Sequence, residues 1–258
     1  MTTQVELSQN GPVARITLRG EKGIQILSAE TRRRLRETVE QVATVDCSVV
    51  VFAGEGRTFI AGASIDELRS LNEAGALEDS LAGQQLMSAL ENLPQTTIAA
   101  IHGACAGGGT ELVLACDLRF AAEDAKIGLP ETSIGVLPGW GGTVRATHLL
   151  GAAVARRLIL TGELIAADEA LRLGLVDAVF PAEKFGDEVE ARVAQILTRG
   201  PQARRRVKHL LRQHAADGID LAAQFDAEAR AFAECYRTGE PREGMSAFLE
   251  KRPAVWWK

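Results

Sequence analysis

The chain has 258 residues, 46% of them hydrophobic, which is enough for a globular protein with a substantial buried core. Its net charge of −5 argues against a general polyanion-binding surface, and no apolar run reaches the ~18–20 residues of a membrane span. The polar start at residues 1–5 lacks the basic-then-apolar order of a secretory signal. We therefore expect a cytoplasmic protein that binds neither membranes nor nucleic acid.

The first half of the chain alternates short apolar runs with helical patterns. Strands are expected at residues 13–18, 49–53, 98–101 and 118–121. Ser28 is placed to cap a helix that runs to about residue 44, and further helices are expected at 67–71 and 81–93. Strands that alternate with helices indicate an α/β layer architecture.

After residue 143 the pattern becomes mainly helical. Helices are expected at 143–150, 152–160, 167–173, 183–198, 202–216, 220–236 and 242–251, with one strand at 176–180. Two arginine triplets, at 32–34 and 204–206, precede apolar residues at helical spacing. We expect both triplets on the solvent-exposed faces of amphipathic helices.

The four cysteines show no Cys-x-x-Cys spacing, and three of them lie in apolar segments: Cys47, Cys105, Cys116 and Cys235. This pattern is typical of reduced packing residues rather than of disulfides or metal ligands. No metal site is expected.

Two glutamates beside glycine-rich turns are the strongest indication of chemistry. Glu111 follows residues 106–110 (Ala-Gly-Gly-Gly-Thr) in the first turn of an apolar helix, where the helix dipole favours negative charge. Glu131 lies in a turn after residues 128–130 (Gly-Leu-Pro). Carboxylates in unlike environments can serve as general acid and general base on one substrate.

Backbone N–H groups of two small-residue turns are candidates for binding an oxyanion. Residues 61–63 (Ala-Gly-Ala) follow a predicted strand and precede a helix, and residues 107–109 are three glycines. Two N–H donors that converge on one carbonyl oxygen form an oxyanion hole.

Other glycine motifs give weaker interpretations. Neither a phosphate-binding loop nor a dinucleotide fingerprint is present, which disfavours nucleoside triphosphates and NAD. Residues 103–107 match the shape of a nucleophile elbow with Cys105 as the nucleophile. Such a site requires an acid and a histidine, for which the chain offers Glu131, Asp168, Asp177, His209 and His214.

The sequence resembles the enoyl-CoA hydratase/isomerase, or crotonase, family over nearly its entire length. The resemblance rests on residues 54–68, 101–117, 128–143, 160–162 with 170–176, and 242–252. It implies an α/β fold built as a crotonase-like spiral of ββα repeats over residues 1–198. It further implies a C-terminal helical oligomerisation region at 199–258 and a homotrimer or a dimer of trimers.

The resemblance also implies roles for single residues. Ala63 and Gly108 match the two main-chain donors to the thioester oxygen, and Glu111 and Glu131 match the two catalytic carboxylates. In hydratases of the family both glutamates hold the attacking water; the first assists its activation and the second gives a proton to the α-carbon. Gly139 resembles a glycine whose N–H positions that water.

Substrate contacts are implied at six further positions: Arg57, Ala61, Ile65, Trp140, Phe232 and Lys251. Arg57 matches a basic position near the coenzyme A phosphates, and the last two match residues that reach the adenine of a neighbouring subunit's ligand. Ser64 departs from the family's aspartate, although its hydroxyl is still expected to cap the next helix. Trp140 replaces a small residue and is expected to reshape the acyl pocket or to pack on the following helix.

Retention of both glutamates favours an enoyl-CoA hydratase that acts on a short- or medium-chain enoyl-CoA thioester. No cofactor is expected, because coenzyme A is part of the substrate. The alternatives are an enoyl-CoA isomerase, or related enolate chemistry on the same fold, and a non-catalytic or RNA-binding scaffold. The arginine triplets are the best support for the scaffold.

Overall fold

A six-stranded sheet forms one layer of the protein. The structure is a computed structural model and describes residues 2–214 and 221–256. The strands lie in the spatial order β1 (Thr3–Asn10), β2 (Val13–Gly20), β4 (Val49–Glu55), β7 (Thr96–Ile101), β9 (Leu118–Ala122) and β12 (Ala178–Phe180). The β1–β2 pair is antiparallel and every other pair is parallel. Burial of both faces explains why residues 49–52 form an unbroken apolar run in β4.

Short strands form a second layer. A four-stranded sheet has the order β11 (Leu164–Ala166), β10 (Lys126–Gly128), β8 (Ala104–Ala106) and β5 (Thr58–Ile60), and β3 (Ile26–Leu27) pairs with β6 (Gly62–Ala63). The long strands β4, β7 and β9 are each followed by a short strand of the second layer and then by a helix. This order is a ββα repeat, as expected for the spiral.

Eleven α-helices and three 3-10 helices lie within the described residues. They are α1 (Ala29–Thr44), α2 (Ile65–Arg69), α3 (Glu73–Glu91), α4 (Gly108–Leu114), α5 (Gly142–Leu150), α6 (Ala152–Thr161), α7 (Ala167–Arg172), α8 (Phe185–Leu197), α9 (Pro201–His214), α10 (Leu221–Cys235), α11 (Glu240–Leu249), η1 (Glu21–Gly23), η2 (Pro130–Ile134) and η3 (Ala182–Lys184). None of the described helices is long and apolar enough to cross a membrane.

Side-chain caps explain where three of these helices begin. Ser28 accepts a hydrogen bond from the Thr31 amide, and Ser64 accepts one from the Glu67 amide, so both expected caps are confirmed. Asn72 caps α3 in the same way, through the Gly75 amide. The predicted start of this helix at residue 81 was therefore wrong, because the Asn72 cap allows the helix to begin at Glu73.

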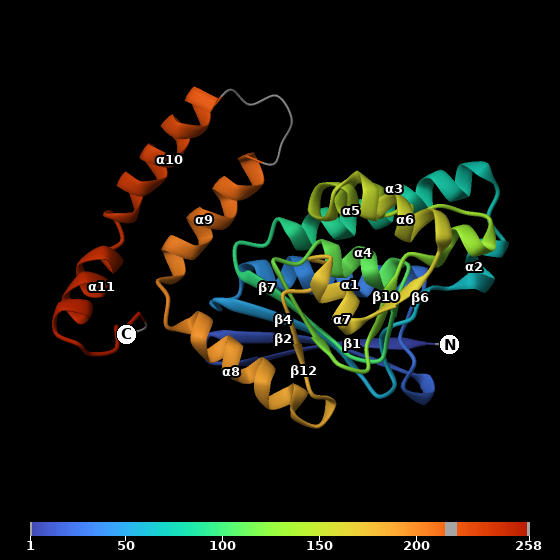
Figure 1. Cartoon of the computed structure of the whole chain (residues 1–258), viewed down its shortest axis with the longest axis horizontal. Helices are drawn as coiled ribbons and strands as arrows, with labels where there is room; N and C mark the ends of the chain where they lie inside the picture. Colours follow the sequence, from blue (N-terminus) through green and yellow to red (C-terminus); the bar gives the residue numbers. More distant parts are fainter. Residues whose placement is uncertain (1, 215–220, 257–258) are drawn as a thin grey trace.

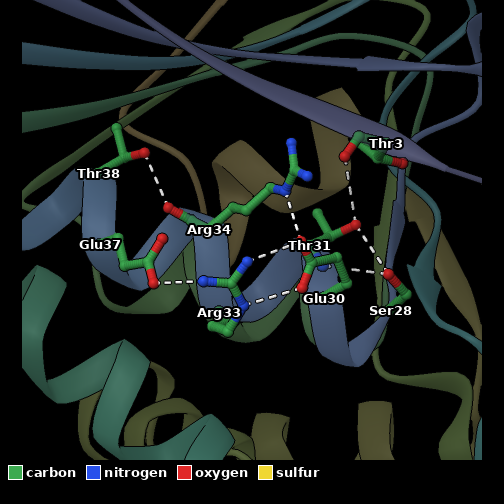
Figure 2. A network of polar contacts seen from close by, with 8 residues as sticks. All are labelled: Thr3, Ser28, Glu30, Thr31, Arg33, Arg34, Glu37 and Thr38. Carbon is green, nitrogen blue, oxygen red and sulfur yellow. Dashed lines mark hydrogen bonds and ion pairs between the residues drawn. The ribbon is translucent and has the colours of Figure 1, made fainter.

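The first arginine triplet is divided between solvent and core. Arg33 and Arg34 are exposed and both bond the Glu30 carboxylate, as Figure 2 shows, so the expected solvent-exposed face holds for them. Arg32 contradicts the expectation: its residue is 9% exposed, it pairs with Asp79 of α3, and its guanidinium lies 4.5 Å from the ring centre of Trp140. The expectation fails because α3 covers this side of α1.

The second triplet also contradicts the sequence-based expectation. Arg204 donates to Thr96 Oγ1 at 2.7 Å, Arg205 donates to the Cys47 carbonyl at 3.2 Å, and Lys208 Nζ lies 2.7 Å from Asp117 Oδ2. Arg204, Arg205 and Lys208 therefore face the body of the protein, because strand ends there offer carbonyl, hydroxyl and carboxylate oxygens. Arg206, the third residue of the triplet, instead lies 3.6 Å from the Glu234 carboxylate of α10. The apolar side chains of Val207 and Leu211 are exposed instead.

The C-terminal helices lie beside the body that holds the sheets (Figure 1). In the figure α9 runs along the edge of the body, and α10 packs along α9. The expected helices at 202–216 and 220–236 are seen as α9 and α10, and residues 215–220 lie outside the described part of the chain. Large apolar side chains are exposed on this helical region: Val207, Leu211, Phe225, Phe232, Tyr236, Met245, Phe248, Leu249 and Val255.

The different burial of Arg32 and Arg33 predicts different effects of their replacement on the free energy of unfolding. Arg32→Ala leaves the largely buried Asp79 carboxylate without its cation, and we expect a loss of about 3 kcal/mol in the free energy of unfolding. Arg33→Ala, on the same helix, serves as the matched control and should change little, because exposed ion pairs contribute little. Urea denaturation of the two variants checks this, and equal losses would contradict the buried role of Arg32.

Candidate active site

A cavity of about 530 Å³ lies between α2, α3, α4 and the segment from residue 130 to 140. Its wall contains eight of the residues singled out in the sequence: Ala61, Ala63, Ile65, Gly108, Glu111, Glu131, Gly139 and Trp140. Much of the remaining wall is apolar and includes Leu68, Leu71, Ile134, Val136 and Leu137. An apolar cavity with a few convergent polar groups is the usual form of a small-molecule site.

Glu111 is fixed by backbone amides. It lies in the first turn of α4, its residue is 2% exposed, and its Oε1 accepts hydrogen bonds from the amides of Trp140 at 2.7 Å and Gly142 at 2.8 Å. Burial raises the pKa of Glu111 to about 7; the Glu131 charge adds to this effect, while the two amides and Arg145 oppose it. The carboxyl group can therefore gain or lose a proton near neutral pH.

Glu131 reaches the same cavity without such support. It lies in η2, and within the described chain both of its carboxylate oxygens are buried and have no hydrogen-bond partner. Its carboxylate lies over Gly107, where a Cβ atom would be only 3.3 Å from Oε1. Burial raises the pKa of Glu131 to about 7. The structure thus places the two carboxylates in one cavity and in unlike environments.

The two candidate amide donors also lie at the cavity wall. Gly108 is the first residue of α4, so its N–H belongs to the first turn, where amides have no partner within the helix. Gly107 enters this helix with φ +53°, a conformation that favours glycine and lets the chain turn sharply. Ala63 ends β6 and follows Gly62, whose φ is +124°.

Gly139 is held by α3. Its carbonyl accepts hydrogen bonds from Ser80 Oγ at 2.6 Å and from Gln84 Nε2 at 3.1 Å. The Gly139 carbonyl and the Trp140 N–H belong to one planar peptide group, so these bonds also orient the amide that binds Glu111.

Three predicted substrate contacts lie outside the cavity wall. Arg57 is exposed in the turn between β4 and β5. Phe232 on α10 is 65% exposed and meets Tyr236 edge to face, with ring centres 5.7 Å apart. Lys251 is exposed just after α11. Their contacts with coenzyme A, two of them across a subunit boundary, stay predictions.

The nucleophile-elbow interpretation is wrong. Cys105 is fully buried in β8 and is not part of the cavity wall, and burial raises the pKa of its thiol to about 12. Asp177 is paired with Arg119 at 3.1 Å, and His209 is exposed on α9. The His214 side chain lies outside the described residues. A buried thiol of such high pKa does not act as a nucleophile.

Sequence reasoning missed four residues that support the site: Arg32, Asp79, Ser80 and Arg145. Asp79 and Ser80 line the cavity from α3, and Arg145 Nη1 donates to the Trp140 carbonyl at 3.3 Å. The Asn72 cap is the signal that could have revealed Asp79 and Ser80, because it extends α3 back over both. Nothing in the sequence singled out Arg145.

Comparisons with known proteins agree with this geometry. The profile of the family described as enoyl-CoA hydratase/isomerase matches residues 8–258. The chain belongs to the enoyl-CoA hydratase/isomerase family. It is 33% identical to a short-chain-enoyl-CoA hydratase of Clostridium acetobutylicum, over 98% of this chain and 97% of that protein. It is 35% identical to a crotonyl-CoA hydratase of Syntrophomonas wolfei, over 96% and 95% of the two chains.

A solved structure of the family confirms the fold. The crystal structure of an enoyl-CoA hydratase from Bacillus anthracis superposes with a TM-score of 0.91 at 35% identity, covering 98% of each chain. The expected crotonase fold, a mixed α/β architecture with helices at the C-terminal end, is therefore correct. Membership of this family identifies the protein as an enzyme.

The raised pKa of Glu131 should appear in the pH dependence of stability. Between pH 4.5 and about 7 the unfolded chain has lost a proton that the folded chain keeps, so the wild-type protein loses stability as the pH rises. The shift corresponds to roughly 3 kcal/mol. Glu131→Gln, which cannot ionise, should gain stability of this order over the wild type above about pH 7 and little near pH 4.5. Urea denaturation across this range checks it, and a pH-independent difference would contradict it.

Proposed function

We propose that the protein is an enoyl-CoA hydratase that adds water across the 2,3 double bond of a short- or medium-chain enoyl-CoA to give a 3-hydroxyacyl-CoA. The observation that carries the proposal is the pair of glutamates, one buried and one half-buried, each with a pKa raised to about 7, in one apolar cavity. The names of the Clostridium acetobutylicum and Syntrophomonas wolfei relatives support the same activity.

The proposed mechanism assigns the developing charge to backbone amides. The Ala63 and Gly108 N–H groups bind the thioester oxygen, which gains enolate charge as water attacks the β-carbon. Because these dipoles are fixed, they stabilise the transition state more than the ground state. The apolar wall excludes bulk water and strengthens both hydrogen bonds.

The two carboxyl groups divide the proton transfers. Both hold the attacking water. Glu111, kept in place by the Trp140 and Gly142 amides, assists its activation by accepting the proton that the water loses as its oxygen bonds the β-carbon, and Glu131 gives a proton to the α-carbon. Proton exchange with solvent then returns both carboxyl groups to their starting states. The Gly139 amide helps to position the water. A pKa near 7 suits both donation and acceptance at neutral pH. The reaction is redox-neutral and, as written, uses no metal or cofactor beyond the coenzyme A of the substrate.

Replacing either carboxylate should abolish hydration. Glu111→Gln or Glu131→Gln is expected to lower kcat by about 10²–10⁴ while an unreactive acyl-CoA still binds, because a positioned acid or base contributes on this scale. Loss of the conjugated absorbance of crotonyl-CoA measures the rate, and calorimetry with butanoyl-CoA measures binding. Full activity in either variant would refute the assignment.

Product analysis separates the remaining alternatives. Only hydration yields a 3-hydroxyacyl thioester, whereas an isomerase on this fold yields a shifted double bond. The RNA-binding scaffold loses its best support, since Arg32 lies in a buried ion pair and Arg204 and Arg205 contact the body of the protein. We retain the proposals that the protein binds no nucleic acid or membrane and resides in the cytoplasm.

The exposed apolar residues of α9–α11 support a homotrimer or a dimer of trimers. We propose residues 1–198 as the catalytic core and residues 199–258 as the region for subunit contacts. In such an assembly Phe232 and Lys251 would reach the adenine end of a neighbouring subunit's substrate, while Arg57 would contact the phosphates. The acidic overall charge makes such local basic groups necessary for a phosphate-bearing ligand.

The subunit contact can be tested on α9. Leu211→Glu places a charge on a side chain that is 62% exposed in the single chain, so the trimer or hexamer should dissociate if this face is covered in the assembly. Leu160→Glu, at a 69% exposed leucine on α6, is the matched control and should keep the assembly. Light scattering of both variants gives the mass, and a monomeric wild type would contradict the proposed assembly.

A further inference from the structure

The indole of Trp140 fills the space between two helices that flank the cavity. A Cβ atom on Gly83 of α3 would lie 2.1 Å from Trp140 Cδ1, and a Cβ on Gly108 of α4 would lie 2.2 Å from Trp140 Cζ3. The indole can occupy this space only because residues 83 and 108 have no side chain. The residue is 4% exposed and belongs to the cavity wall.

Three polar interactions lock the ring in this place. Trp140 Nε1 donates to Asp79 Oδ2 at 3.1 Å, the second oxygen of Asp79 pairs with Arg32, and the Arg32 guanidinium lies 4.5 Å from the ring centre. The backbone N–H of the same residue holds Glu111. Rotation of the indole out of the wall would break the bond to Asp79 and the contact with Arg32, so the ring is a fixed surface rather than a movable gate.

We propose that Trp140, clamped by Asp79 and Arg32, is the specificity-determining residue that closes the buried acyl site and favours short acyl chains. This inference rests on the proposed function. A chain whose thioester oxygen is bound at Gly108 and whose double bond lies by Glu111 meets the indole within a few carbons, because the ring contacts Gly108 and its own amide binds Glu111.

The rest of the wall offers longer chains little burial. Leu71, Ile134 and Leu137, which also line the cavity, are 36%, 52% and 64% exposed. Added methylenes that lie along these residues stay partly hydrated, so each adds little binding free energy. The fully buried space between α3 and α4 would give more, and the indole occupies it.

Binding of saturated acyl-CoAs tests the inference without depending on turnover. In Trp140→Ala the ratio of Kd for butanoyl-CoA to Kd for decanoyl-CoA should rise by about tenfold or more over the wild type, the scale of one or two methylenes housed in an apolar pocket. Trp140→Phe keeps an aromatic ring in the wall but loses the Asp79 bond, and it should raise the ratio less than Trp140→Ala does. An unchanged ratio in Trp140→Ala would overturn the inference.

A refilling variant separates the shape of the pocket from general loss of structure. Gly83→Leu in the Trp140→Ala background sends a side chain from α3 into the vacated space, because the Cβ of residue 83 starts where the ring lay. The double variant should return the ratio toward the wild-type value, and failure to do so would overturn a steric role. If the wild type binds neither butanoyl-CoA nor decanoyl-CoA, both the proposed function and this inference fail. If the wild type binds them and Trp140→Ala leaves the ratio of the two Kd values unchanged, only this inference fails.

Discussion

The hydrogen bonds from the Trp140 and Gly142 amides to Glu111 are the interaction on which the site depends. They join the first turn of α4 to the glycine-rich entry of α5, two segments that meet only because the ββα repeats place them together. A carboxylate buried at this depth is costly unless amides or cations satisfy it. Here both amides bond one carboxylate oxygen of Glu111, which anchors the side chain. The other oxygen has no partner among the described residues.

Glu131 differs from Glu111 in how the cost of burying its carboxylate is met. Within the described chain its carboxylate oxygens have no hydrogen-bond partner, and burial raises its pKa against the smaller opposing effect of its own backbone amide. An orphaned buried carboxylate is unfavourable in a protein that only needs to fold. Under the proposed function, its position in the wall of a cavity trades stability for chemistry, since a bound substrate and water would supply the missing partners.

Much of this arrangement could be predicted from the sequence. The long strands of the main sheet, the Ser28 cap and the glycine turns beside Glu111 all follow from local patterns. The short strands β5, β6 and β8 could not be predicted, because two or three residues such as Gly62–Ala63 carry no periodicity. Arg32 and Arg204 were misplaced for a related reason: amphipathicity shows that a helix has two faces but not which face a neighbouring element covers.

The reversed orientation of α9 has a consequence for how the protein responds to salt. The helix is joined to its own body by charged and polar groups such as Lys208 with Asp117, whereas Val207 and Leu211 point outward. Added salt screens the first kind of attachment little, because Lys208 and Asp117 are only 11% and 27% exposed, whereas strongly hydrated anions such as sulfate strengthen association of the second kind. A rise in sulfate concentration therefore acts mainly on the outer, apolar surface of this helix and leaves its inner, polar attachment nearly unchanged.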